Sequence, residues 1–167
     1  RRSAMRFLIK QRVFSWTDTY DIYDEHHKKK YVVRGELISL GHVLNVFDTN
    51  NKKVGEVREK LISFMPTFTV YERGQNLGPI HKKMTMFHPK YEFDSKDWSI
   101  EGDLVGWNYD IKHGRNRIAK ISKQLLHWGD TYIIDVANPS DALTVLLLVV
   151  AIDAANCEER DPKHREQ

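Results

Sequence analysis

The chain has 167 residues, of which 41% are hydrophobic and 29% are charged, and its formal net charge at pH 7 is +3. This composition is typical of a folded globular domain with one substantial core, and it excludes a wholly disordered chain. A net charge so close to zero does not by itself predict a nucleic-acid or membrane partner.

We expect one domain that spans residues 5–157. Residues 1–4 precede Met5 and are interpreted as linker residues, and residues 158–167 are interpreted as a polar C-terminal tail. The single cysteine, Cys157, has no second cysteine in the chain with which to form a disulfide. Because the sequence also shows no signal peptide, we expect a cytoplasmic protein.

Short segments of alternating polar and apolar residues, separated by turn residues, fill the chain from Arg6 to Val136. Their spacing of about ten residues is that of an antiparallel meander. Twelve strands are predicted: Arg6–Val13, Tyr20–Tyr23, Tyr31–Gly35, Val43–Phe47, Val54–Lys60, Thr67–Glu72, Leu77–Met84, Lys90–Asp94, Ser99–Asp103, Trp107–Ile111, Arg117–Ser122 and Thr131–Val136.

One helix is predicted after the strands, at Ser140–Asn156. Thr144 is the only polar residue from Ala142 to Ile152. Asn138 or Ser140 can cap its first turn, where Pro139 is also favourable. A helix that is apolar on all sides must be surrounded by protein or by lipid. Because spanning a bilayer takes about 20 apolar residues, we expect a core helix and no transmembrane segment.

The strands and the helix together predict the architecture. An open sheet of so many strands would expose edges, so closure into a barrel is expected. Such a barrel is too wide for its own side chains to fill, and a helix about 25 Å long can fill it from end to end. We therefore predict an all-β fold with one helix: a closed twelve-stranded antiparallel barrel around a central hydrophobic C-terminal α-helix, with aliphatic and aromatic residues at the inward strand positions.

The order and spacing of several segments resemble the bacterial YxjI-like branch of the LURP-one-related family. The resemblance covers about Phe7 to Asp153. The matching positions are Leu44, Val46, Asp48, Val54, Val57, Leu61, Phe64, Thr67–Tyr71, Arg117, Ile118, Ala119, Ile121, Ser122, Trp128, Gly129, Asp130, Tyr132 and Leu146–Ala154.

This resemblance implies the same fold as the periodicity does, because the family is similar to the C-terminal domain of Tubby and to the phospholipid scramblases. In that superfamily, Tubby domains bind phosphoinositides, scramblases act at membranes, plant members are linked to defence, and bacterial members have no assigned role. A shared fold does not imply a shared activity. No lipid-binding motif of Tubby matches particular positions of this chain.

Residue patterns for catalysis, metal binding and cofactor binding are absent from the sequence. It contains no HExxH, no second cysteine for zinc, no GxGxxG and no Walker motif. We therefore predict a non-enzymatic protein with no catalytic, metal-binding or cofactor-binding residues. His26 and His27 are expected in an exposed polar loop. Asp153, near the end of the apolar helix, is either a structural ion-pair partner, which we favour, or a catalytic carboxylate in a pocket at the barrel mouth.

A basic segment is the strongest positive signal. No acidic residue occurs from Ile111 to Gly129, where the candidate residues for an anion or lipid headgroup are Lys112, Arg115, Arg117, Lys120 and Lys123. Such a stripe attracts anionic headgroups. The alternative, which we favour, is a solvated strand and turn, because strand alternation should place Arg117 and Lys120 on opposite faces.

Three classes of function follow, in order of preference. The first is a binding module whose barrel exterior contacts an anionic membrane surface, as a peripheral protein, or a protein partner. The second is a nucleic-acid-binding barrel, in which Trp107, Tyr109 and Trp128 would stack on bases, although we expect these aromatics inside the barrel. The last is an enzyme with a pocket near Asp153.

Overall fold

The computed structural model describes residues 5–10, 19–38, 41–62, 65–84, 86, 89–126 and 129–160. The described strands are β1 (Met5–Ile9), β2 (Thr19–Asp24), β3 (Lys29–Ile38), β4 (Gly41–Asp48), β5 (Lys53–Ile62), β6 (Met65–Glu72), β7 (Gln75–Met84), β8 (Pro89–Phe93), β9 (Trp98–Asp103), β10 (Asn108–His113), β11 (Asn116–Leu126) and β12 (Gly129–Val136). Two 3₁₀ turns, η1 (Asp94–Lys96) and η2 (Pro139–Asp141), and the helix α1 (Ala142–Arg160) complete the elements.

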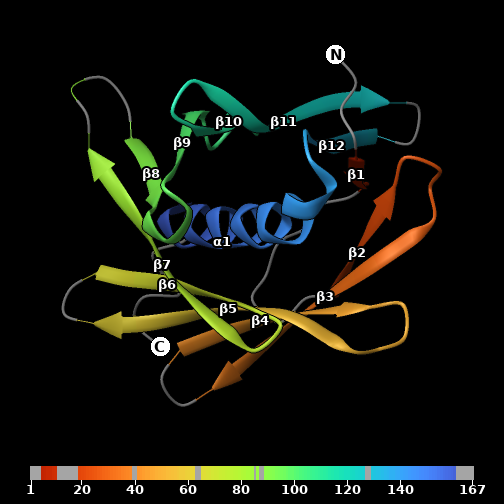
Figure 1. Ribbon diagram of the computed structural model, residues 1–167. Coiled ribbons are helices and arrows are strands. Elements are labelled where there is room, and N and C mark those ends of the chain that lie inside the picture. The colour runs from red at the N-terminus through yellow and green to blue at the C-terminus, as the bar shows by residue number, and fades with distance from the viewer. Residues whose placement is uncertain are drawn as a thin grey trace.

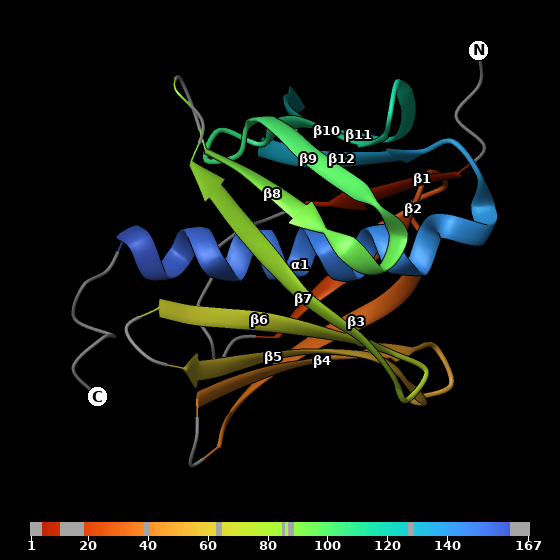
Figure 2. The same cartoon turned by 60° about the vertical axis from the view of Figure 1, so that its left-hand side comes forward.

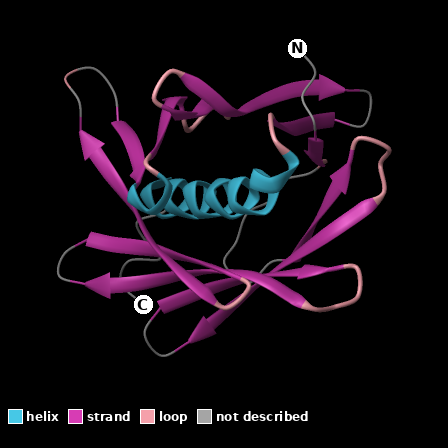
Figure 3. Cartoon of the chain, viewed as in Figure 1, coloured by secondary structure: helices cyan, strands magenta, loops and turns pink. Residues whose placement is uncertain are grey.

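These strands form a closed antiparallel barrel around α1, as predicted (Figures 1 and 3). Each strand pairs with its neighbours in sequence, and β1 pairs with β12 to close the wall. In that seam Phe7 lies opposite Ile134, and Ile9 lies opposite Tyr132. Closure leaves no unpaired edge among these strands, which removes the usual route to edge-to-edge aggregation.

The antiparallel order gives the barrel two different rims. We call the rim where α1 enters the barrel the entry rim; it carries the connections β2–β3, β4–β5, β6–β7, β8–β9 and β10–β11. The opposite rim, where α1 ends, is the exit rim and carries the other strand connections. Figure 2 shows the start of α1 with these hairpin tips on the right, and the end of α1 on the left.

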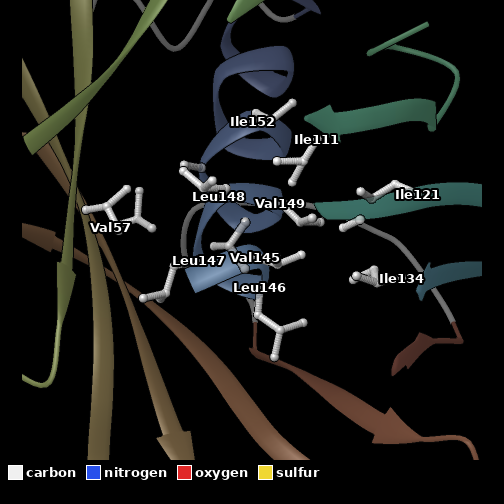
Figure 4. Close-up of a cluster of buried hydrophobic side chains, with 14 of the residues drawn as sticks. Val57, Ile111, Ile121, Ile134, Val145, Leu146, Leu147, Leu148, Val149 and Ile152 are labelled. Carbon is white, nitrogen blue, oxygen red and sulfur yellow. The ribbon is translucent and has the colours of Figure 1, made fainter. Parts of the chain in front are cut away.

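From Ala142 to Asn156, helix α1 is buried on all sides, because the inward residues of the wall pack around it (Figure 4). Leu146, Leu147 and Leu148 are successive residues, yet each is 0% exposed. Most of the wall residues in this core are aliphatic or aromatic, as predicted, and include Val57, Ile111, Ile121 and Ile134, although the buried Glu59 is polar. The helix is apolar on every side because it lies along the axis of the barrel, where no side of it meets water.

By length and composition alone, the window Pro139–Asn156 could cross a membrane, with a mean hydropathy of 1.4. The length of the apolar segment therefore does not by itself exclude a transmembrane helix, although we had expected it to. In the fold, however, 78% of this window is buried inside the protein. The barrel wall supplies the apolar surroundings that a helix of this composition requires.

The start of the helix follows the predicted capping pattern. The Asn138 side chain accepts a hydrogen bond from the Ser140 backbone N–H, and Pro139 occupies the first turn. The helix continues to Arg160, beyond the predicted end at Asn156 and into the segment 158–160 that we interpreted as tail. Cys157, Glu158, Glu159 and Arg160 contain no residue that breaks a helix, so the element extends through them.

All twelve predicted strands occur, although several limits differ; β3 and β11, for example, run on to Ile38 and Leu126, beyond the predicted Gly35 and Ser122. Strand β1 ends at Ile9, whereas the sequence predicted Val13; residues 11–13 lie outside the described part of the chain. Trp107 is in a turn with φ of 57°, not in β10 as predicted. A left-handed backbone is incompatible with a strand, so β10 begins one residue later.

Candidate functional site

The predicted basic segment lies on β10, β11 and the turn between them. Ile111 faces Ala119 across the two strands, whereas Lys112 faces Arg117, so Ile118 is an extra residue in β11. This β-bulge reverses the alternation. Arg117 and Lys120 therefore lie on the same outer face, and the expectation of opposite faces was wrong.

Neighbouring acids neutralise most of this segment. Arg117 Nε lies 3.3 Å from Asp110 Oδ1, and Lys120 Nζ lies 3.6 Å from the same oxygen. Lys123 Nζ lies 3.7 Å from Asp130 Oδ2. The stretch is free of acids in sequence, but Asp110 precedes it and Asp130 follows it, and the sheet brings both beside it. Three of the five candidate residues are thus ion-paired.

The remaining two candidates, Lys112 and Arg115, lie at the tip of the β10–β11 hairpin on the entry rim. Four further cations lie on the other hairpin tips of this rim: Lys28 on β2–β3, Lys52 on β4–β5, Arg73 on β6–β7 and Lys96 on β8–β9. Within the described residues, none of these six side chains forms an ion pair with a carboxylate. We call these six residues the cation ring.

The connections of the entry rim contain more cations than acids. Segments 24–30, 48–53, 72–75, 94–97, 112–117 and 137–141 contain ten lysines and arginines and seven aspartates and glutamates. This excess equals the formal net charge of the whole chain, +3. The connections of the entry rim therefore carry a formal net charge of +3.

Local hydrogen bonds explain why two of these tips have the same shape. Asp24 Oδ1 accepts hydrogen bonds from the backbone N–H groups of His26 and Lys28. Asp48 Oδ1 does the same for Asn50 and Lys52. The hydrogen bond from the Lys28 backbone has the largest effect on the Asp24 carboxyl, and together with that from His26 it holds the pKa below its usual value although burial opposes it. Each aspartate therefore holds the cation four residues later on a fixed turn.

A cavity of about 250 Å³ opens beside two of these tips. Its lining residues are Lys53, Val54, Gly55, Glu56, Tyr71 and Gly74. Lys53 Nζ and Arg58 Nε both donate hydrogen bonds to the Glu56 carboxylate, which is 7% exposed. The cavity lies near the entry rim, far from Asp153, where a catalytic pocket had been the alternative expectation.

Polar side chains inside the barrel have structural partners. Thr144 on α1 donates a hydrogen bond to Glu72 near the entry rim, and Asn156 donates one to the Leu104 carbonyl oxygen at 2.9 Å. His42 Nδ1 lies 3.3 Å from Glu59 Oε1, and Glu59 is 3% exposed. Asp153 is also buried, at 6% exposed.

Residues for other chemistry are not assembled in the described part of the chain. No three His, Cys, Asp or Glu side chains there converge on a metal site. Trp107 is 5% exposed and Tyr109 is 2% exposed, so these aromatics are inside the barrel as expected, while Trp128 lies outside the described residues. His26 and His27 lie in the exposed β2–β3 turn, also as expected.

Sequence reasoning did not group Lys28, Lys52, Arg73 and Lys96 together, because they are scattered along 69 residues of the chain. A repeat could have located three of them. A motif of three consecutive residues, aliphatic then aromatic then acidic, comes just before three successive hairpin tips. It occurs at Ile22–Asp24, Val46–Asp48 and Val70–Glu72, with a period of 24 residues. Equivalent hairpins of a meander end at the same rim, so this period predicts a shared location for the cations.

Comparisons with known proteins agree with the architecture. The model of the LURP-one-related family matches residues 5–153. The protein of Bacillus subtilis named "Uncharacterized protein YxjI" is 29% identical over 157 residues, which cover 94% of this chain and 97% of that protein. An X-ray structure of a protein from Arabidopsis thaliana covers 90% of both chains with a TM-score of 0.62 and 14% identity, a likeness of fold.

Proposed function

This chain belongs to the LURP-one-related family, as its sequence had indicated, and we propose that it is a non-enzymatic binding module that contacts anionic phospholipid headgroups through the entry rim. The supporting observation is the cation ring of Lys28, Lys52, Arg73, Lys96, Lys112 and Arg115, at least one on each hairpin tip. The proposal places the protein peripherally on a membrane surface.

The arrangement of the cation ring fits a flat anionic surface. Tips of successive hairpins at one rim are about 10 Å apart, twice the spacing of paired strands. A bilayer with many headgroups can meet all tips at once. Each lysine or arginine near such a surface contributes about 1 kcal/mol, so several together give binding that is measurable and sensitive to salt.

Cosedimentation with vesicles tests this proposal. We expect the protein to sediment with vesicles of phosphatidylglycerol and phosphatidylcholine, and to remain in the supernatant with pure phosphatidylcholine. Reversal of two ring charges, Lys112→Glu with Arg115→Glu, should weaken binding at least about tenfold, because both favourable contributions become unfavourable. Binding should also decline as sodium chloride is added.

A matched control separates the ring from the rest of the basic segment. Lys123→Glu with Lys120→Glu carries the same change in net charge, but these lysines already pair with Asp130 and Asp110 outside the ring. We expect this control to retain more binding than the ring variant. Equal recovery with neutral and anionic vesicles, or an equal loss in both variants, would contradict the proposal.

Other functions have less support. Trp107 and Tyr109 are buried, so neither offers a stacking surface for nucleic-acid bases. The cavity lies away from the buried Asp153, and its one acidic residue, Glu56, is already held by two cations.

A further inference from the structure

Three large hydrophobic side chains of the described residues are strongly exposed to solvent. Met86 is 88% exposed, Leu125 is 81% exposed and Val105 is 54% exposed. They are far apart in the sequence and belong to different parts of the wall. Single exposed apolar residues are ordinary on protein surfaces, but a concentration of them at one place marks an interaction site.

All three lie at the exit rim. Met86 belongs to the connection β7–β8, Val105 to the connection β9–β10, and Leu125 to the end of β11. These positions follow one another around the barrel, because β7 to β12 are successive neighbours. Adjacent tips are about 10 Å apart, so the three side chains border one continuous arc of the rim. The entry rim has no large hydrophobic side chain exposed in this way among its described residues.

Charges beside this arc are balanced, in contrast to those of the cation ring. Lys83 Nζ lies 2.7 Å from Glu92 Oε2, close to the connection that carries Met86. Lys123 Nζ lies 3.7 Å from Asp130 Oδ2, next to Leu125. The tips that carry Met86 and Leu125 therefore each have a cation and an acid nearby, so neither tip has an excess of positive charge to attract an anionic membrane.

We infer that the exit rim is a self-association surface, whose occupant is a second copy of this chain. A surface with apolar tips and both signs of charge is complementary to itself, since a two-fold axis brings Lys123 of one copy toward Asp130 of the other. The apolar tips then bury one another in the centre of the contact, with the ion pairs at its rim.

Such a dimer would have its two entry rims at opposite poles. Within each copy α1 connects the rims, over about 28 Å for its 19 residues. If the proposed function holds, the dimer presents a cation ring in two opposite directions. It would therefore join two anionic vesicles, whereas a monomer would only coat one.

Sedimentation velocity without lipid, from micromolar to submillimolar protein, tests the inference. We expect wild type to pass from monomer to dimer over this range. Leu125→Glu and Met86→Glu should each raise the dissociation constant at least about tenfold, because a buried unpaired carboxylate would replace a central apolar contact. Thr49→Glu, on the exposed β4–β5 turn at the entry rim, is the control and should leave the dimer unchanged.

Two results would overturn the inference. One is a failure of the lipid-free measurement, in which wild type stays monomeric at every concentration or the two variants dimerise as tightly as wild type does. The other is a monomer that sediments with pure phosphatidylcholine vesicles while Leu125→Glu does not, which would make the bilayer the occupant. Clustering of anionic vesicles, measured by turbidity, rests on the proposed function; the lipid-free measurement does not, so either idea can fail alone.

Discussion

Glu56 on β5 is a carboxylate whose charge depends on its two cationic neighbours. It is 7% exposed, and it accepts hydrogen bonds from Lys53 Nζ and from Arg58 Nε, the latter at 3.0 Å. Burial raises the pKa of this carboxyl, but the hydrogen bonds from Lys53 and Arg58 and their charges outweigh burial and hold the pKa below its ordinary value. The folded state therefore favours the ionised form of Glu56.

This lowered pKa predicts a pH-dependent effect of Glu56→Gln. A carboxyl with a depressed pKa in the folded state stabilises the fold above its unfolded pKa of about 4.3, and this contribution is lost as the pH falls through the folded value. We expect the variant to be less stable by about 1 kcal/mol at pH 7, because the partners are solvent-exposed. The difference should close in acid. Urea unfolding at several pH values measures it, and a difference that does not change with pH would contradict the assignment.

In the basic segment, the sequence reveals the run of cations but not the ion pairs that these cations form. The run from Lys112 to Lys123 could be predicted, because it is local. Its neutralisation could not, because Asp110 and Asp130 become neighbours of Arg117, Lys120 and Lys123 only through strand register. The two residues that remain unpaired, Lys112 and Arg115, lie near the hairpin tip, where Asp97 of the neighbouring hairpin contacts His113 instead.

Four of the five hairpins of the entry rim have a change of register just before the tip. It occurs after Ile22, Val46, Val70 and Ile111. The strands themselves were predictable from alternation and turn residues. The bulges were not, because an extra residue in one strand is defined only relative to its partner. Since each bulge reverses the alternation beyond it, predictions of strand face near the tips fail while those in the middle of the wall succeed.

Gly55 on β5 lies directly against Leu147 of the helix. A methyl group added there would lie 2.4 Å from Leu147 Cδ2, and Leu147 is 0% exposed. We expect Gly55→Ala to destabilise the protein by about 1–3 kcal/mol through overpacking. Leu147→Ala alone should cost about 2–5 kcal/mol because it leaves a cavity.

The double variant is the decisive measurement for this contact. In the Leu147→Ala background the added methyl group enters vacated space, so Gly55→Ala should cost little or become stabilising. Urea unfolding of the four proteins gives the interaction energy, expected at about 1–3 kcal/mol. Additive losses would mean that the strain at Gly55 does not come from Leu147.

For the whole molecule, two properties follow from the sequence alone: many short strands and one helix without a polar face. Each is a local pattern, and only a closed barrel with an axial helix satisfies both. The distribution of surface properties between the two rims was not readable, because it depends on which connections share an end. Lys28 and Arg115 are 87 residues apart in sequence yet lie on one rim, as do Met86 and Leu125 on the other.

We expect that neither the barrel nor the helix folds without the other, because each covers apolar surface that the other would expose to water. The inward residues of the wall, from Phe7 on β1 to Val136 on β12, pack with α1 in one core. Without the helix, the wall would enclose a wide apolar space with nothing to fill it. A chain that ends at Asn138 should therefore fail to form the closed barrel, and it should aggregate or expose apolar surface.

A chain that ends at Arg160 is the control, since it keeps all of α1. We expect it to unfold in one cooperative transition, with circular dichroism and tryptophan fluorescence coincident. The shorter chain should lack this transition and bind a hydrophobic dye such as ANS. If the shorter chain instead unfolds cooperatively at a similar urea concentration, the wall is stable alone and α1 is an added element, not the core on which the barrel depends.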